Sequence, residues 1–449
     1  MKKLYISSSM LLVFVSIFFS SCLFGFPNEH TPPSEIHEVE VENYEIAYCW
    51  QDPNGKQSII SDEDKEVVIV VSDIKGIYKK VIQSQYNNEP NASNMVIFKN
   101  GCLSVDTAVF KQGWYSLAWR PNSNEIIFAE GTDWSLSHFN SKLISNMEIK
   151  EGEFKDWIYD SRGYFSIPRG IYWSNDGSKF ATLGRDIMPL GTIGDNIWVA
   201  SGNPPSYTRI TNIMEVGDFI ANASWSSDNT KLAITYRKNS GIAIVTLDNQ
   251  NQVESYINVT KKEFSELSEY WPFVFTSFLQ LISDLKHSGF SSYVSVNSIP
   301  VWINNDQQII FAASSSSDQS TLFIVDSDGT NLEPFLPDVS GLIFMPRLSA
   351  NGRTLAFVRY PNWKTRDKVE IATVDIYTKE ISSLVVLYSQ TEEDLIISGM
   401  NWSPDGKYLM FSSNHAGESD IYIITADGSA WKNITEDIDG NAVGPIWKP

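Results

Sequence analysis

Residues Asn401–Phe411 read NWSPDGKYLMF, and this pattern of a tryptophan, a polar turn and an apolar run decides the fold. The tryptophan or its replacement recurs along the chain, at intervals of 54, 52, 77, 46, 54 and 45 residues, and the series ends at Trp447. Self-similarity at such a period indicates a repeat architecture. Weaker copies of the pattern begin at Ala118, Tyr172, Ser224, Val301 and Arg347.

Each repeat predicts one four-stranded antiparallel sheet, because about 45 residues hold four short strands and their turns. Asp405-Gly406 and Asn351-Gly352 supply the left-handed backbone that a tight hairpin needs. The runs between turns, such as Ile421–Thr425, are short and rich in β-branched and aromatic residues. We therefore expect buried strands, with the repeated tryptophans packed between neighbouring sheets.

Sheets that cannot bury both faces alone can stack around an axis, which leaves only short, protected edges. The sequence thus predicts an all-β fold, a β-propeller of four-stranded antiparallel blades. Gly444–Pro449 begin one further copy, and we expect Tyr44–Trp50, Ser58–Ser61 and Val67–Ser72 to complete it, so that N- and C-terminal strands close the ring. Seven blades are favoured, and six would result if Tyr44–Val109 formed a separate unit.

The block WSPDGKYLMFSS at Trp402–Ser413, followed by DIYIITADG and by Asn433–Thr435, resembles the repeat of the TolB-like β-propeller family, which is WD40-like. The resemblance covers roughly residues 119–449 and is most specific in this last copy. Elsewhere Leu348 replaces the tryptophan, and Asp306 lacks the following glycine. The resemblance implies the propeller fold. The name-giving member also carries an N-terminal α/β domain, for which we expect little room in this chain, so no Tol function is inferred.

The first residues predict export. Lys2 and Lys3 precede the apolar run Met10–Phe19, which has the length of a signal-peptide core and is too short to span a membrane. Ser21 and Cys22 resemble the lipobox at which bacterial lipoproteins are cleaved and acylated. We expect residues 1–21 to be a lipoprotein signal peptide, with secretion without lipid and an uncleaved anchor as alternatives.

Residues 22–43 are acidic and contain proline, a composition typical of an extended, solvated tether. They would hold residues 44–449, the predicted propeller, away from a membrane to which Cys22 is anchored. The alternative is that this segment is a disordered leader without a function. The expected location is the bacterial cell envelope, at its periplasmic or extracellular face.

The three cysteines are consistent with an exported protein. If Cys22 carries lipid, Cys49 and Cys102 are the only two that could pair. A disulfide between them would secure the N-terminal region, and two buried free thiols are the alternative.

The 77-residue interval departs from the strand pattern. Thr260–Glu263 matches a helix capping box, and the apolar spacing that follows predicts two short helices inserted over residues 261–289. Trp271, Phe275 and Phe278 would offer an apolar surface to a partner, or would pack on the protein's own blades.

Composition and motifs limit the function classes. The formal net charge of −20 disfavours nucleic acid as a partner. The five histidines form no HExxH pair, and the sequence contains no GxSxG or Walker A motif, so no catalytic residue, cofactor or metal ligand is predicted.

The favoured function is a lipid-anchored envelope module, expected to be monomeric, that binds or scaffolds an envelope protein or glycan. The alternative is a propeller hydrolase or lyase acting on carbohydrate or peptide at the axial mouth. Inward-facing carboxylates with a histidine would favour chemistry, whereas an apolar and aromatic lining would favour binding.

Overall fold

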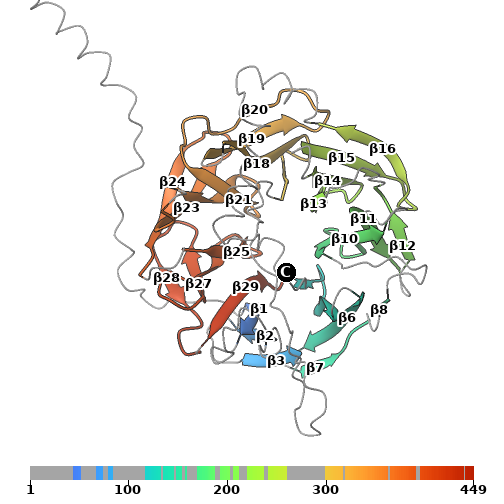
Figure 1. Cartoon of the computed structure of the whole chain (residues 1–449), viewed down its shortest axis with the longest axis horizontal. Coiled ribbons are helices and arrows are strands. Elements are labelled where there is room, and N and C mark those ends of the chain that lie inside the picture. The colour runs from blue at the N-terminus through green and yellow to red at the C-terminus, as the bar shows by residue number, and fades with distance from the viewer. Residues whose placement is uncertain are drawn as a thin grey trace, which may run out of the picture.

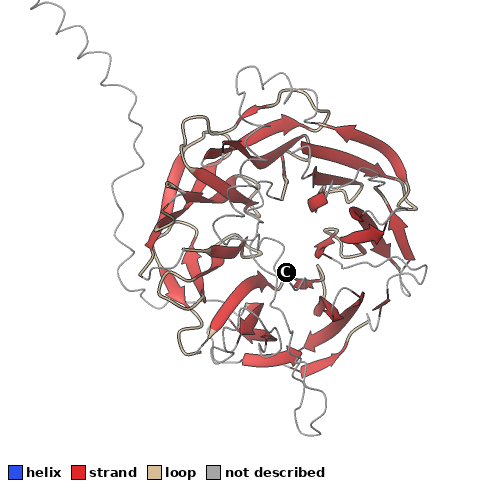
Figure 2. Cartoon of the chain, viewed as in Figure 1, coloured by secondary structure: helices blue, strands red, loops and turns tan. Residues whose placement is uncertain are grey.

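The computed structural model describes residues 44–51, 67–73, 79–83, 117–132, 135–145, 148–153, 157–158, 169–187, 193–202, 206–211, 220–236, 241–259, 299–316, 319–362, 365–390, 395–438 and 440–449. Within these ranges every regular element is a β-strand, and Figure 2 shows the strands arranged in sheets around a common centre. No helix in this described part of the chain has the length and apolar character needed to cross a membrane.

The described strands form six four-stranded sheets and one five-stranded sheet. The two ends of the chain share one sheet, with strands in the order β29 (Asn441–Trp447), β1 (Glu45–Gln51), β2 (Val67–Asp73) and β3 (Lys79–Gln83). The five-stranded sheet contains β4 (Leu117–Trp119), β5 (Glu125–Thr132), β6 (Ser135–Ser145), β7 (Glu148–Glu151) and β8 (Trp157–Ile158), which pairs with β6.

The other five sheets follow in chain order. The first contains β9 (Arg169–Trp173), β10 (Lys179–Ile187), β11 (Ile193–Ser201) and β12 (Ser206–Arg209), and the second contains β13 (Ile220–Trp225), β14 (Lys231–Tyr236), β15 (Gly241–Leu247) and β16 (Val253–Asn258). The third contains β17 (Val301–Ile303), β18 (Gln308–Ser316), β19 (Gln319–Asp326) and β20 (Glu333–Pro334), and the fourth contains β21 (Leu342–Leu348), β22 (Thr354–Tyr360), β23 (Lys368–Asp375) and β24 (Ile381–Tyr388). The fifth contains β25 (Ile397–Trp402), β26 (Tyr408–Ser413), β27 (Asp420–Thr425) and β28 (Trp431–Asn433).

The sheets form because each repeat alternates tight turns with apolar runs. Strands pair antiparallel with their sequence neighbours, as in β26 and β27, where Tyr408 lies opposite Thr425. All six residues of β26 are buried, since blades pack on both faces of this sheet. The apolar clusters lie between adjacent blades: one of them joins β21–β24 to β25–β28 through residues such as Val358, Leu409 and Phe411. The predicted all-β fold with four-stranded antiparallel blades is confirmed.

The two chain ends meet in one sheet. β1 lies between β2 and β29, with Ile46 opposite both Ser72 and Trp447. The stretches Tyr44–Trp50 and Val67–Ser72 therefore join the C-terminal repeat as expected and do not form a separate unit, while Ser58–Ser61 lies outside the described residues.

The innermost strands contact one another in the sequence β4, β9, β13, β17, β21, β25 and β29, and β29 contacts β4 in turn. Figure 1 shows the sheets arranged around one centre. At this last contact the Lys448 ammonium lies 5.5 Å from the centre of the Trp119 ring, a cation–π distance. The predicted signal peptide (1–21), the tether (22–43) and the helical insertion (261–289) lie outside the described residues.

Candidate functional site

A cavity of about 690 Å³ lies where the innermost strands surround the axis of the ring. Residues from all seven innermost strands and from the turns that follow them contribute to its wall, so no single blade builds the site. The lining consists of Leu117, Ala118, Trp119, Tyr172, Asn175, Ser224, Trp225, Ser227, Ile299, Pro300, Val301, Trp302, Asp306, Arg347, Leu348, Asn401, Trp402, Pro404, Ile446, Trp447 and Pro449.

The repeated tryptophans form the rigid part of this wall. Four of them donate the indole Nε1–H to a backbone carbonyl of the preceding blade, and each of these four exposes less than a tenth of its surface. This confirms that the tryptophans pack between neighbouring blades. The bonds join Trp225 to Tyr172 at 2.8 Å, Trp302 to Ser224 at 3.1 Å, Trp402 to Arg347 at 2.9 Å and Trp447 to Asn401 at 3.0 Å.

The residue directly before each tryptophan position also lines the cavity. Because the strand places this residue equivalently in every blade, the seven positions form a ring around the axis, which we call the axial ring. Its members are Ala118, Tyr172, Ser224, Val301, Arg347, Asn401 and Ile446. Sequence reasoning overlooked these residues, although their place next to the recurring tryptophan was a signal that could have found them.

Polar and apolar residues occupy different parts of the cavity wall. Five consecutive blades, from β9 to β25, contribute the polar side chains, whereas the lining side chains from β29, β4 and Pro449 are apolar. The polar residues are Asn175, Ser224, Ser227, Asp306, Arg347 and Asn401, and the apolar arc consists of Leu117, Ala118, Trp119, Ile446, Trp447 and Pro449. The cavity is therefore amphipathic.

Asp306 is the acidic side chain among the described lining residues, and hydrogen bonds from Ser227 hold it in place. Its Oδ2 accepts hydrogen bonds from the Ser227 backbone N–H at 2.7 Å and from the Ser227 hydroxyl at 2.5 Å. Asn304, Asn305 and Asp306 all have positive φ, between 52° and 63°, in the turn that places this carboxylate. The carboxylate thus links two blades across the cavity rim.

Arg347 supplies positive charge to the cavity wall. Burial lowers the pKa of its guanidinium to about 10, because the charged form loses hydration. The side chain still carries its charge at neutral pH. Its Nη1 donates to the Pro346 carbonyl at 2.7 Å, which fixes the orientation of the guanidinium.

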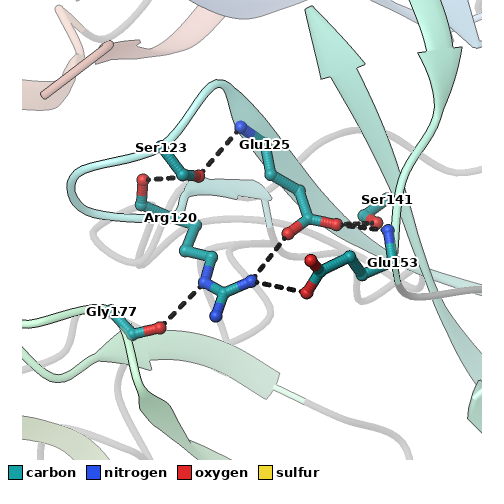
Figure 3. Close-up of polar contacts among 6 residues, drawn as sticks. All are labelled: Arg120, Ser123, Glu125, Ser141, Glu153 and Gly177. Atoms are coloured by element: carbon teal, nitrogen blue, oxygen red, sulfur yellow. Dashed lines mark hydrogen bonds and ion pairs between the residues drawn. The ribbon is translucent and has the colours of Figure 1, made fainter. Parts of the chain in front are cut away.

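Beside the apolar arc, an ion-pair network holds the turn after β4 (Figure 3). Arg120 Nη1 contacts Glu125 Oε2 at 3.0 Å and Glu153 Oε2 at 2.9 Å, while its Nε donates to the carbonyl of Gly177 in the next blade at 2.8 Å. Glu125 is buried, and its other carboxylate oxygen accepts from the Ser141 hydroxyl at 2.5 Å. Because every partner of Glu125 is a structural neighbour, this network holds two blades together and offers no reactive group.

The arrangement is suited to binding. The described lining residues include no histidine, and their carboxylate already accepts two hydrogen bonds. Over the described residues generally, no group of three or more His, Cys, Asp or Glu side chains is placed to hold a metal ion. A mostly apolar wall with a few fixed polar groups is typical of binding sites.

The residues singled out from the sequence lie elsewhere. Cys22, Cys102, Trp271, Phe275 and Phe278 are outside the described residues. Cys49 lies in β1, where its backbone pairs with Ile69 and Val443, but its side chain is not described. Lipid attachment, the disulfide and the apolar partner surface therefore stay predictions.

Comparison with known proteins agrees with this fold. Residues 295–449 match the family described as the TolB beta propeller domain, so this part of the chain is similar to that domain. A comparison with curated proteins finds no match.

Several solved structures are similar to this chain, although they differ widely from it in sequence. TolB from Acinetobacter baumannii is 13% identical, with 90% of this chain and 67% of that chain covered and a TM-score of 0.43. A protein from Lactobacillus plantarum is 9% identical over 90% and 99% of the two chains, with a TM-score of 0.50.

A puromycin-hydrolyzing peptidase from Mycobacterium tuberculosis is 8% identical, with a TM-score of 0.55. The alignment covers 90% of this chain and 56% of the peptidase, so this chain spans little more than half of that enzyme. At these identities the likeness shows the fold alone.

Proposed function

We propose that this chain is a binding module of the bacterial cell envelope that receives a segment of a partner protein in its axial cavity. The observation that carries the proposal is the amphipathic wall, in which an apolar arc faces fixed polar groups. An extended peptide has the matching character, since it presents side chains of different polarity on opposite sides and backbone groups that can accept and donate hydrogen bonds.

The same wall argues for a protein segment over a glycan. A sugar ring would need an open aromatic face on which to stack, but the cavity tryptophans lie between blades and expose less than a tenth of their surface. Four of their indole N–H groups already donate hydrogen bonds to backbone carbonyls of neighbouring blades. A peptide side chain needs only an apolar recess, and the arc formed by Ala118, Ile446 and their neighbours provides one.

A lipid-anchored location completes the proposal. The apolar run Met10–Phe19 and the Ser21-Cys22 pair support export and acylation, and residues 23–36 could span on the order of 45 Å when extended. The propeller would then stand off from the membrane and present the cavity to partners in the envelope. A Cys22→Ser variant should leave the membrane fraction and appear as soluble protein, while wild-type protein that fractionates as soluble would contradict anchoring.

The cavity is tested by capture from envelope extract with the mature protein from Cys22 onward. Ile446→Asp places a carboxylate in the apolar arc and should weaken capture of the partner about tenfold or more, which is about 1.4 kcal/mol of binding free energy. Tyr377→Asp makes the same charge change at a side chain that is 61% exposed and is not part of the cavity lining, so it serves as the matched control.

Equal capture by the wild type, Ile446→Asp and Tyr377→Asp would contradict binding in the cavity, provided that thermal unfolding shows all three to be folded. A third variant lacking residues 261–289 tests the other predicted surface. Loss of capture in this variant alone would place the partner on the insertion that carries Trp271, Phe275 and Phe278.

A further inference from the structure

Three hairpin turns of the propeller share one side-chain arrangement. In each, a buried serine at the end of the innermost strand donates its hydroxyl hydrogen to an aspartate two residues later, and this aspartate also accepts a backbone N–H. The serine–aspartate pairs are Ser174–Asp176 at 2.6 Å, Ser226–Asp228 at 2.6 Å and Ser403–Asp405 at 2.8 Å.

The turn between β21 and β22 departs from this arrangement, because Asn351 stands where the other three turns have aspartate. Its Oδ1 accepts the backbone N–H groups of Arg353 at 2.8 Å and Thr354 at 3.0 Å. Its Nδ2 donates to the Thr354 hydroxyl at 3.1 Å. The Ser349 hydroxyl, on a residue that is 3% exposed, makes no hydrogen bond. A buried polar group without a partner destabilises the fold, because it has lost its hydrogen bonds to water.

We propose that Asn351 is a modification site, at which spontaneous deamidation converts this turn to the carboxylate form of the other three. Asn351 is exposed, and it precedes Gly352, which has no side chain to hinder attack by its own backbone nitrogen. A Cβ added at Gly352 would meet nothing within 4 Å, so there is open space in which the reaction can take place.

The chemistry needs only water as a co-reactant. The Gly352 backbone nitrogen attacks Cγ of Asn351, a C–N bond forms, and the side-chain amide leaves as ammonia. Water then opens the cyclic imide at one of its two carbonyls, which gives aspartate or isoaspartate. In the folded turn the Gly352 N–H donates to the Ser349 carbonyl at 2.9 Å, so the reaction proceeds through local opening of the hairpin.

The two products, aspartate and isoaspartate, have opposite effects on the stability of this hairpin turn. Aspartate offers a second acceptor oxygen in place of the amide NH₂ group, and the Ser349 hydroxyl can then bond as its three equivalents do. Isoaspartate lengthens the backbone by one carbon and breaks the register of β21 with β22. Arg347 and Leu348, which line the cavity, precede Ser349 directly, so either product also adds negative charge beside the candidate binding site.

The test incubates the full chain at mildly alkaline pH and follows deamidation by peptide mass spectrometry. Asn351 should be converted several-fold faster than Asn175, which is also exposed in a hairpin turn but precedes Asp176. Equal or slower conversion of Asn351 would overturn the proposal. The Asn351→Gln variant, which lacks the reactive side-chain length, should show no conversion at this position and identifies the modified peptide.

A second measurement uses Asn351→Asp, which supplies the carboxylate without the reaction. Its thermal unfolding temperature should rise relative to wild type, and the rise should disappear in the double variant that also carries Ser349→Ala. An Asn351→Asp protein of unchanged or lower unfolding temperature would contradict the claimed gain for Ser349. It would leave the mass-spectrometric result to decide whether the site is modified at all.

Discussion

Two neighbouring contacts between blades are held together in different ways. Between β13 and β17, Trp302 reaches across and donates its indole N–H to the Ser224 carbonyl at 3.1 Å. Between β17 and β21, Leu348 stands at the tryptophan position and can make no such bond. A large apolar cluster covers this second contact, and it includes Phe335 and Phe357. The tryptophan is therefore one of several ways to join blades, and apolar burial replaces its hydrogen bond where the cluster is large enough.

The largest effect is expected where a tryptophan contact is removed entirely. Trp402→Ala should lower the free energy of unfolding by about 3–5 kcal/mol, because it leaves a cavity between blades and removes the indole hydrogen bond to the Arg347 carbonyl. Chemical denaturation measures this change, with Tyr377→Ala, an exposed side chain, as the control. A loss no larger than that of Leu348→Ala would contradict the special role of the tryptophan contact.

A third kind of contact joins the sheet of β4 to that of β9. Glu125→Ala should destabilise the protein by about 1–3 kcal/mol, because it removes the buried carboxylate that pairs with Arg120 and leaves the buried Ser141 hydroxyl without this acceptor (Figure 3). Glu153→Ala is the matched control, since Glu153 also pairs with Arg120 but is 52% exposed, and its loss should be much smaller. Equal losses of stability in the two variants would mean that the burial of Glu125 adds nothing to the strength of this contact.

The hydrogen bond alone should have a smaller effect than the whole side chain. Trp302→Phe keeps an aromatic ring between the blades and removes the bond to Ser224, so we expect a loss of about 1 kcal/mol beyond the change in packing. Leu348→Met, which conserves volume and breaks no hydrogen bond, provides the comparison. If both variants unfold at the same denaturant concentration as wild type, the hydrogen bond between the blades contributes no net stability.

The smallest effect is a pH dependence at the contact between β21–β24 and β25–β28. Burial lowers the pKa of His415, whose ring lies 4.8 Å from that of Tyr422, although the nearby Asp420 carboxylate opposes the shift. A histidine with a lowered pKa in the folded state stabilises the fold above its ordinary pKa of 6.5, and this contribution is lost as the pH falls below it.

The thermal unfolding temperature should change less between about pH 7.5 and about pH 5.5 in His415→Phe than in wild type, because phenylalanine at position 415 cannot be protonated. An unchanged difference would assign the acid sensitivity to other groups. Asp427, whose pKa the hydroxyls of Thr425 and Ser429 lower to about 2, titrates far below this window and does not confuse the measurement.

The sequence predicted the fold more fully than the site. The recurring tryptophan and its turn residues predicted the blades, and the incomplete copy around Trp447 predicted the pairing with β1, because both are local patterns with a fixed spacing. The axial cavity could not be predicted in the same way. Its polar residues come from five blades, and only the ring brings Asn175 near Asn401 in one wall. The fifth strand β8 was also not foreseen, since Trp157–Ile158 is too short to show a pattern.

The pairing of the first and last strands sets a timing for biosynthesis. The Lys448 ammonium contacts the Glu45 carboxylate across 403 residues of sequence, and β29 covers the edge of β1 that β2 leaves free. At roughly 5–20 residues per second, a ribosome needs on the order of 20–80 seconds to separate the synthesis of these two partners. During that interval the early blades have no completed ring to join. The free edge of β1 therefore lacks its native partner until the C-terminal residues have been synthesised.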